Sequence, residues 1–369
     1  MFAGRFGCYP PDKVIVVTKM VDGAEAFDQS ARYPIVRVPL LRNGPPHYEW
    51  AGMVWDFIKT GWKLIRQHQI ERIECARPFP EGIAAYVLSK RFGIPYLNNV
   101  HGDEVGVFQR YKVERVLIKK MLRAARLNLA SSHATERLVK QLAGADLKTQ
   151  VVLPGFSPAF LRKPAPEAVA RLREQVGGSP ILLTVGRIAQ VRKGHDHVIK
   201  ALPDVIPHFP NVKYVVIGAT DDLAIERLRQ LRAMADELGV NDHIFWVDDV
   251  INTTLPVYYA ACDLFLMPNR VGPPGDVEGF GIVYLEAGYF NKPVIGGNSG
   301  GVPDAVLDGK TGLLVDGTDP HDVARGILQI LSNPALAAQM GENGAAHALS
   351  LTHERVFERY QQIITEAGA

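Results

Sequence analysis

The sequence has few cysteines and no long apolar run. Its three cysteines, Cys8, Cys75 and Cys262, are far apart and fit no metal-ligand spacing, which excludes a disulfide framework or a zinc site built from them. No segment approaches the length of a transmembrane helix, and no apolar run near the N-terminus resembles a signal peptide. The cytoplasm is therefore the expected location.

The sequence also lacks an excess of charge of one sign. Its 41 Lys and Arg residues against 39 Asp and Glu residues leave a net charge of +2, which argues against nucleic acid as the main partner. Neither Val14 nor Ile181, where the first strand of a domain could begin, is followed by the G-x-G-x-x-G turn of a nicotinamide-dependent oxidoreductase. The 369 residues, 47% of them hydrophobic, suit a globular protein with two buried cores.

Short β-branched apolar runs alternate with longer helical patterns, which is typical of βαβ units and parallel sheets. In the first half, strands are expected at Val14–Val17, Ile35–Val38, Ile70–Cys75, Ile94–Asn98, Leu127–Ala130 and Gln150–Leu153. In the second half, they are expected at Ile181–Val185, Lys213–Ile217, Ile244–Val247, Leu264–Met267, Pro293–Ile295 and Leu313–Val315.

The stretch Leu153–Pro166, rich in proline and charge, interrupts this pattern and predicts an interdomain linker. We therefore expect an α/β protein with two doubly wound, Rossmann-like domains at residues 1–155 and 156–350. A last helix, within residues 351–369, is expected to pack back toward the first domain. Ligands of such sheets bind beyond the carboxyl ends of the strands, in a cleft.

The segment TVGRIAQVRKG, at residues 184–194, combines a glycine and two candidate anion ligands after a predicted strand. Gly186 lets the backbone turn sharply and approach a ligand. Arg187 lies at the carboxyl edge of the strand, and Lys193 just precedes a helix start. Such a guanidinium, ammonium and helix N-terminus together suit a diphosphate. A solvated basic loop explains the same residues equally well.

The segment DVEGFGIVYLE, at residues 276–286, places two glutamates eight residues apart. Glu278 precedes Gly279 and Gly281 in a loop, and Glu286 falls inside the following helix. The glycines permit close backbone approach, and the free amides of the helix start point outward. Carboxylates accept hydrogen bonds from vicinal hydroxyls, so the pattern favours sugar recognition over a plain surface loop.

His101 directly follows the strand predicted at Ile94–Asn98, in the sequence HGDE. A histidine at the carboxyl end of a strand would reach a bound ligand and hydrogen-bond a sugar hydroxyl or a transferring group. A single histidine is more often structural, so this motif by itself favours the structural interpretation.

The order GR…RKG, MPNR…DVEGFGIVYLEA, PVIGGNSGGVPDAV and TGLLV resembles the retaining glycosyltransferases of family 4, which have the GT-B fold of two facing Rossmann-like domains. The resemblance is dense over residues 180–316 and thinner in the first domain, where HGDE and the ASS of Ala130–Ser132 carry it. The segments DVEGFGIVYLEA and SGGVPDAV look similar to those of bacterial phosphatidylinositol-mannoside mannosyltransferases.

The resemblance implies a role for each matching position. His101, Arg187, Lys193 and Glu278 would take part in catalysis, with the two basic side chains at the departing diphosphate. Glu278 would contact the transferred sugar, and Glu286 the ribose. The implied donor-binding residues are Gly186, Val247, Gly279, Phe280, Gly281, Ile282, Glu286, Ser299 and Gly300, with the base near Val247.

The resemblance also implies the chemistry. The donor would be a GDP-sugar or UDP-sugar, with mannose as the leading sugar, and the acceptor a sugar or a lipid-linked sugar. Transfer would retain the anomeric configuration through front-face attack, so the carboxylate-pair geometry of glycosidases does not apply to Glu278 and Glu286. No metal ion or other cofactor is expected, because basic side chains and helix dipoles neutralise the leaving phosphate.

The chain departs from the family at its start, MFAGRFGCYPPDKVIVVTK, where relatives have a first strand, a glycine-rich turn and a first helix. The first domain is expected to lack that strand and helix. This leaves open a catalytically impaired protein that binds nucleotide sugars or acts as a scaffold. It also leaves open a homo-oligomer, because apolar strand edges need covering.

The stretch Arg110–Arg126 carries seven basic residues against one acid, Glu114. Five of them share one helical face: Lys112, Arg115, Lys119, Arg123 and Arg126. The apolar residues are expected largely elsewhere, namely Val113, Val116, Leu117, Met121 and Ala124. Such a helix could rest on an anionic membrane surface. An ordinary amphipathic helix covering the first sheet is the alternative.

Overall fold

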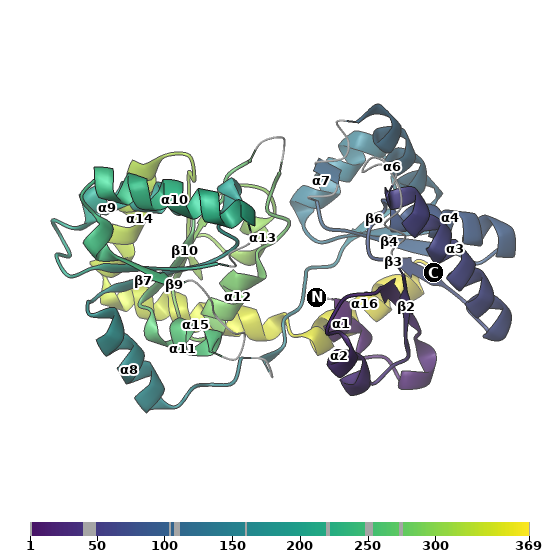
Figure 1. The fold of residues 1–369 in the computed structure, drawn as a ribbon, viewed down its shortest axis with the longest axis horizontal. Helices are drawn as coiled ribbons and strands as arrows, with labels where there is room; N and C mark the ends of the chain where they lie inside the picture. The colour runs from purple at the N-terminus through teal and green to yellow at the C-terminus, as the bar shows by residue number, and fades with distance from the viewer. Residues whose placement is uncertain are drawn as a thin grey trace. The chain divides into compact units, whose positions relative to one another are not determined.

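The computed structural model describes residues 2–39, 49–102, 105–106, 111–158, 161–218, 222–247, 254–272 and 276–368. The chain forms two compact units (Figure 1). Unit 1 consists of Met1–Gly155 and His353–Ala369, and unit 2 of Phe156–Thr352. Both ends of the chain therefore belong to unit 1.

Unit 1 contains two parallel sheets. Strand β1 (Val16–Lys19) pairs with β2 (Ile35–Val38). Strands β3 (Ile73–Cys75), β4 (Tyr96–Val100), β5 (Leu127–Ala130) and β6 (Thr149–Val151) pair in their chain order. Right-handed crossovers that always step in one direction place the connecting helices on one face of a sheet.

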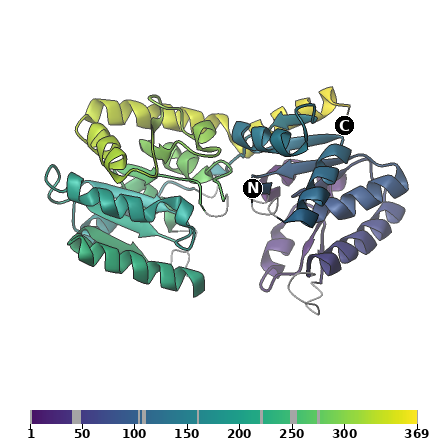
Figure 2. The same cartoon turned by 90° about the horizontal axis from the view of Figure 1, so that it is seen from above.

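Those connecting helices are α4 (Glu81–Phe92), α6 (Lys112–Ala124) and α7 (His133–Ala143). Figure 1 shows them on one side of the sheet and α16 (His353–Glu366) on the other. Helix α3 (Glu49–Gln67) packs along α4, and Figure 2 shows the two side by side. Buried residues of α16, such as Tyr360 and Ile363, complete the core of unit 1.

Within the described residues of unit 1, no strand joins the β1–β2 sheet to the sheet that begins with β3. Helix α1 (Phe2–Phe6) instead contacts the open edge of β3 through Arg5. The Arg5 Nη2 atom donates hydrogen bonds to Glu74 of β3 and to Asn99 of β4, each at 3.0 Å. Burial lowers the pKa of the Arg5 guanidinium, and the charge of Glu74 opposes that shift.

Unit 2 contains one parallel sheet in the order β12-β11-β10-β7-β8-β9. Its strands are β7 (Ile181–Val185), β8 (Lys213–Ile217), β9 (Ile244–Val247), β10 (Leu264–Met267), β11 (Val294–Gly297) and β12 (Gly312–Val315). The strand order reverses between β7 and β10. That reversal is the topological switch point at which open α/β sheets bind their ligands.

Helices cover both faces of this sheet. They are α8 (Pro166–Val176), α9 (His195–Val205), α10 (Asp222–Glu237), α11 (Leu255–Ala261), α12 (Ile282–Tyr289), α13 (Val302–Ala305), α14 (Pro320–Leu331) and α15 (Pro334–Ser350). Leu182, Val216, Leu266 and Ile295 are fully buried in four different strands. Strands that are covered on both faces have continuous apolar sequences, which explains why these strands could be predicted from the sequence.

The strand positions in unit 1 differ from those predicted by a few residues. The first strand is Val16–Lys19 rather than Val14–Val17, because Pro11–Lys13 form a short 3-10 helix that delays it. The strand predicted at Ile70–Cys75 is shorter and spans Ile73–Cys75. Edge strands with one partner have less of the buried, continuous apolar character that marks a strand in a sequence.

Candidate active site

Three neighbouring strands of unit 2 end together at the switch point. Strand β7 leads into Gly186, β10 into Pro268 and Asn269, and β11 ends at Gly297. The loops after β7 and β10 touch at Gly194, which has a φ of +79°. A side-chain carbon there would lie 2.3 Å from the Pro268 carbonyl oxygen, so the close approach requires glycine.

The loops bring Lys193 and Glu278 into direct contact. The Lys193 Nζ atom donates a hydrogen bond of 2.5 Å to Glu278 Oε2, and the two side chains are 12% and 11% exposed. Asn269 Nδ2 donates to the same oxygen at 3.2 Å. Burial lowers the pKa of the Lys193 amine, while the Glu278 carboxylate opposes the shift. The site therefore holds a largely desolvated pair of opposite charges.

A second ion pair locks the two loops, and the sequence did not reveal it. Arg192 is buried, and its Nη1 atom lies 2.5 Å from both carboxylate oxygens of Asp276. Its Nε atom lies 3.5 Å from Glu278 Oε2. The backbone N–H of Arg270 donates to the Arg192 carbonyl at 3.0 Å. Arg192 thus fixes the loop that carries Glu278 against the loop that carries Lys193.

The backbone around Glu278 is held by a glycine turn after β11. The Gly301 N–H donates to the Glu278 carbonyl at 2.8 Å. Gly300 has a φ of +58°, and a side-chain carbon there would lie 2.4 Å from the same carbonyl oxygen. Among the described residues, the buried Ser299 hydroxyl has no hydrogen-bond partner. Gly281, with a φ of +92°, is the N-cap residue of helix α12 (Ile282–Tyr289).

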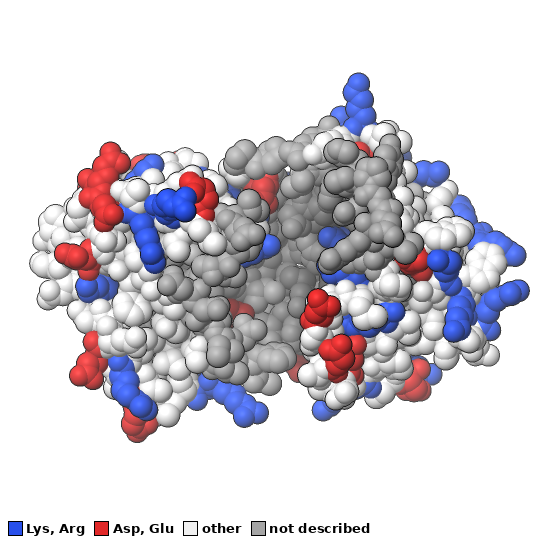
Figure 3. All heavy atoms as spheres, in the orientation of Figure 1, with Lys and Arg blue, Asp and Glu red and all other residues white. Residues whose placement is uncertain are grey.

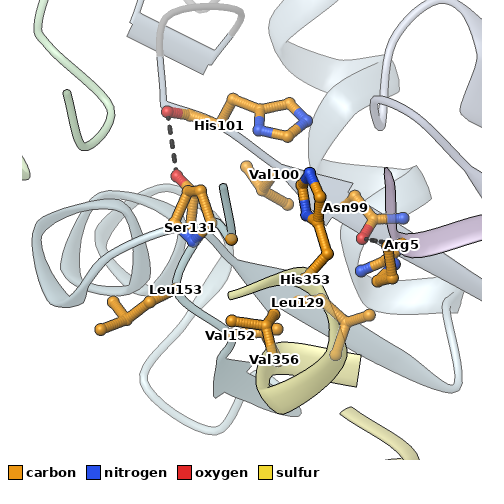
Figure 4. A pocket seen from close by; sticks show the side chains of 12 residues that line it. Arg5, Asn99, Val100, His101, Leu129, Ser131, Val152, Leu153, His353 and Val356 are labelled. Atoms are coloured by element: carbon orange, nitrogen blue, oxygen red, sulfur yellow. Dashed lines mark hydrogen bonds between the residues drawn. The ribbon is translucent and has the colours of Figure 1, made fainter. Parts of the chain in front are cut away.

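Unit 1 has a pocket of its own at the carboxyl ends of β4 and β5 (Figure 4). His101 follows β4 directly, and its carbonyl accepts a hydrogen bond of 3.3 Å from the Ser131 hydroxyl after β5. Arg5, Asn99 and His353 also line the pocket. Burial lowers the pKa of the His353 imidazole. The neighbours of His101 in the HGDE motif, Asp103 and Glu104, lie outside the described residues.

The chain is similar to glycosyltransferases along most of its length. The profile of the family "Glycosyl transferases group 1" matches residues 170–347, and that of "Glycosyltransferase Family 4" matches residues 12–160. The GDP-mannose-dependent alpha-(1-6)-phosphatidylinositol monomannoside mannosyltransferase of Mycolicibacterium smegmatis is 32% identical over 333 residues, which cover 89% of this chain and 83% of that protein. The chain is a family 4 glycosyltransferase.

A second relative and two solved structures extend the comparison. The mannosyltransferase of the same description from Mycobacterium tuberculosis is 31% identical, over 93% of this chain and 86% of that protein. Sucrose-phosphate synthase from Thermosynechococcus elongatus has a TM-score of 0.81 at 22% identity, covering 96% of this chain and 88% of that one. Anabaena HepE, solved with UDP and glucose, has a TM-score of 0.82 at 20% identity, covering 99% and 95%. The predicted GT-B fold is confirmed.

Three other predicted site residues of the glycosyltransferase do not contact the Lys193–Glu278 pair. Arg187 is exposed and lies outside the Lys193–Glu278 pair, although its charge adds to the lowering of the Lys193 pKa. Glu286 lies in α12 and accepts a hydrogen bond of 2.6 Å from the Tyr259 hydroxyl. Burial raises the pKa of the Glu286 carboxyl. Val247 ends the edge strand β9, next to residues 248–253, which are not described.

The remaining predicted donor-binding residues surround the central charge pair or begin the neighbouring helix. A side-chain carbon at Gly186 would lie 3.4 Å from atoms of both Lys193 and Met267, so Gly186 lies against the pair. Phe280 is buried beside Gly279 and Gly281, and Ile282 is the first residue of α12. Unit 2 thus gathers Gly186, Lys193, Glu278, Ser299 and Gly300, whereas His101 belongs to unit 1.

Asp276→Asn is expected to destabilise the glycosyltransferase, because it leaves the buried Arg192 guanidinium without its main counter-charge. Removing one partner of a buried ion pair costs a few kcal/mol, and the partial exposure of Asp276 reduces this to about 2 kcal/mol. We expect the unfolding temperature to fall by about 4–8 °C. Thermal unfolding followed by circular dichroism measures the effect, and an unchanged transition would show that the pair is not stabilising.

His195 is expected to make stability depend on acidic pH. It is the first residue of α9, it is 2% exposed, and its Nδ1 atom lies 3.3 Å from the Tyr214 hydroxyl. Burial lowers the pKa of His195 to about 4. An unfolded histidine has a pKa of about 6.5, so between these values only the unfolded state binds the proton and stability falls as the pH falls.

The size of this effect can be tested with His195→Gln. From pH 7 to pH 4.5, His195 should remove about 2–3 kcal/mol from the free energy of unfolding. Urea unfolding of the parent and the variant at both pH values gives the loss of unfolding free energy for each protein. Because each loss is a difference within one protein, the packing change caused by the substitution cancels. Equal losses in the variant and the parent would refute the assignment.

Proposed function

We propose that this glycosyltransferase, acting in the cytoplasm, moves a hexose from a nucleotide-sugar donor to a sugar or lipid-linked acceptor, with retention and without a metal ion. GDP-mannose is the proposed donor, because the curated relatives carry the description GDP-mannose-dependent. The observation that carries the proposal is the buried Lys193–Glu278 pair at the switch point of unit 2.

Lys193 is proposed to bind the distal phosphate of the donor. Its ammonium is almost buried, so a phosphate oxygen that replaces water beside it interacts in a low-dielectric site. Arg187, exposed at the end of β7, is free to swing toward the same diphosphate. Both charges then stabilise the negative charge that builds up on the leaving group in the transition state.

Glu278 is proposed to bind the sugar. Its Oε2 atom already accepts hydrogen bonds from Lys193 and Asn269, which hold the carboxylate in one orientation. The remaining lone pairs can accept from sugar hydroxyls. The turn at Gly300 and the backbone of residues 279–281 confine the space beside it.

The proposed step is a front-face displacement. The bond between the anomeric carbon and the phosphate oxygen breaks while the acceptor oxygen bonds to the same face of that carbon. The acceptor proton passes to the departing phosphate oxygen, so atoms and charge balance. Glu278 is unsuited to act as a nucleophile from the opposite face, since its carboxylate is neutralised by Lys193. His101, at the pocket of unit 1, is proposed to hydrogen-bond the reacting sugar.

A thermal-shift titration with GDP, UDP, ADP and their sugar conjugates tests the donor assignment. A ligand that binds only the folded state raises stability, by about 2.7 kcal/mol at a hundredfold excess over its dissociation constant. We expect GDP and GDP-mannose to shift the transition most, and Lys193→Met to lose the shift. A larger shift with UDP would overturn the guanine assignment, and no shift with any nucleotide would overturn the donor site.

A transfer assay then tests catalysis and its stereochemistry. Nuclear magnetic resonance of the product formed from GDP-α-mannose should show the α-anomer, which is retention. A β-anomeric product would contradict the front-face step. Tight nucleotide binding without transfer to any sugar or lipid-linked acceptor would mean that the chain binds donor only.

A further inference from the structure

Helices α3, α4 and α6 share one layer on the sheet of unit 1, and α4 packs against both of the others. Lys120 of α6 and Lys90 of α4 lie over the same ring, that of Tyr86, with their ammonium groups 5.0 and 5.9 Å from its centroid. Arg91 of α4 lies 5.2 Å over the ring of Trp62 of α3. These contacts make the outer sides of the three helices one continuous surface, here called the α3–α4–α6 face.

The α3–α4–α6 face is strongly basic. Helix α6 buries Ile118, Met121 and Leu122 against the sheet and exposes Lys112, Arg115, Lys119 and Lys120. Within the part of the chain that the structure describes, Lys112, Arg115 and Lys119 form no ion pair. Helix α3 adds the exposed Lys59, Lys63 and Arg66. Figure 3 shows Lys and Arg gathered over α3 and α4, with few acidic side chains among them.

Large apolar side chains stand among these charges. Val113 and Val116 of α6 are 62% and 66% exposed, and Trp55 of α3 is 57% exposed. The prediction that Val116 lies away from the basic side is wrong, because Val116 is exposed within one helical turn of both Lys112 and Lys119. Arg110, the first residue of the predicted basic stretch, lies outside the described residues. Helix α6 therefore covers the sheet with one side and presents valines and lysines together on the other.

We propose that the α3–α4–α6 face docks on the surface of a membrane that contains anionic phospholipids. Its ammonium and guanidinium groups would contact the lipid phosphates, while Val113, Val116 and Trp55 enter the boundary between headgroups and acyl chains. None of the helices in the described ranges is long and apolar enough to span a membrane, so the contact is peripheral. The inference concerns unit 1 alone and does not depend on the proposed donor site.

The mixture of charge and exposed apolar area favours a membrane over a nucleic acid. A phosphate backbone attracts lysine and arginine but gains nothing from valines on the same helix turn. A membrane interface uses both, since apolar side chains enter the acyl boundary while basic ones reach the headgroups. The charge is also local, because the whole chain carries only +2.

Vesicle flotation of the purified full chain tests the proposal without donor or turnover. Vesicles of phosphatidylcholine alone are compared with vesicles that also contain phosphatidylglycerol. We expect binding to the anionic vesicles only, and release at high salt, because screening weakens the attraction. The triple variant Lys112→Glu, Arg115→Glu, Lys119→Glu should lose at least about tenfold in affinity.

A matched control changes the same charge on unit 2: Lys200→Glu, Arg229→Glu, Lys310→Glu, three exposed positions. It should bind vesicles as the parent does. The pair Val113→Ser, Val116→Ser should weaken binding severalfold while keeping the lipid preference, and Ile225→Ser with Val271→Ser, also exposed, should not.

Three results would overturn the proposal. They are equal or absent binding to the two kinds of vesicle, equal weakening by the charge control, and retention by DNA at a salt concentration where anionic vesicles are not bound. Transfer to a soluble acceptor is measured separately on the same triple variant. Normal transfer with lost vesicle binding supports the face as a docking surface, whereas failure of the donor site would leave vesicle binding intact.

Discussion

We expect Lys193→Met to lower kcat/KM by about a thousandfold. One preorganised charge at a leaving group stabilises the transition state by about 3–4 kcal/mol. Methionine preserves the length and apolar packing of the stem next to Gly186 and Met267. It removes the ammonium that Glu278 contacts at 2.5 Å. Initial rates of nucleotide release in the presence of acceptor measure the loss, and circular dichroism confirms that the variant is folded.

Lys200→Met is the matched control for this experiment. Lys200 lies in the same chain segment, on α9, but it is exposed to solvent. Its replacement should leave kcat/KM within about twofold of the parent, since isolated surface charges contribute little. If Lys193→Met kept the activity of this control, Lys193 could not be the group that stabilises the leaving diphosphate.

Glu278→Gln is expected to lower kcat/KM by about a hundredfold or more, through the loss of a charged acceptor for the sugar hydroxyls. A second effect concerns Lys193. The Glu278 carboxylate opposes the lowering of the Lys193 pKa by burial, so its removal lowers that pKa further. Because Lys193 must be protonated to bind phosphate, the alkaline limb of the residual pH–rate profile should move to lower pH.

Two comparisons separate these effects. Glu286→Gln, in α12, removes a carboxylate that contacts Tyr259 rather than Lys193, so it should change KM for the donor without moving the alkaline limb. Glu278→Ala should unfold at a lower temperature than Glu278→Gln, because glutamine can still accept a hydrogen bond from the buried amine. An alkaline limb that stays in place in Glu278→Gln would rule out Lys193 as the titrating group.

The sheet of unit 2 was predictable because its strands are covered on both faces. Three strands have the predicted bounds: Ile181–Val185, Lys213–Ile217 and Leu264–Met267. A short, continuous apolar run between two turns is typical of a strand that is buried on both faces. Lys193 and Glu278 are candidate site residues because each is a charged residue beside glycines at the end of a strand, and the structure brings their side chains into contact. In unit 1, short edge strands and the proline at the start of Pro11–Lys13 displaced the bounds.

Other features depend on contacts between residues far apart in the chain. Arg192 and Asp276 are 84 residues apart, and their pairing follows only from the adjacency of β7 and β10. His353 joins the pocket that contains His101 only because α16 returns to unit 1. The exposure of Val116 was missed for a related reason, since the periodicity of α6 identifies an apolar position but not whether another element covers it.

The division of the chain has a consequence for its biosynthesis. Unit 1 includes residues 353–369, which the ribosome makes only after the whole of unit 2, residues 156–352. Tyr360, Ile363 and Ile364 of α16 are buried in that unit. A nascent chain must therefore carry an incomplete first core while all of unit 2 is synthesised, at about 5–20 residues per second. During that interval the exposed apolar surface of the early segment is a natural substrate for chaperones, until α16 has been made and packs on it.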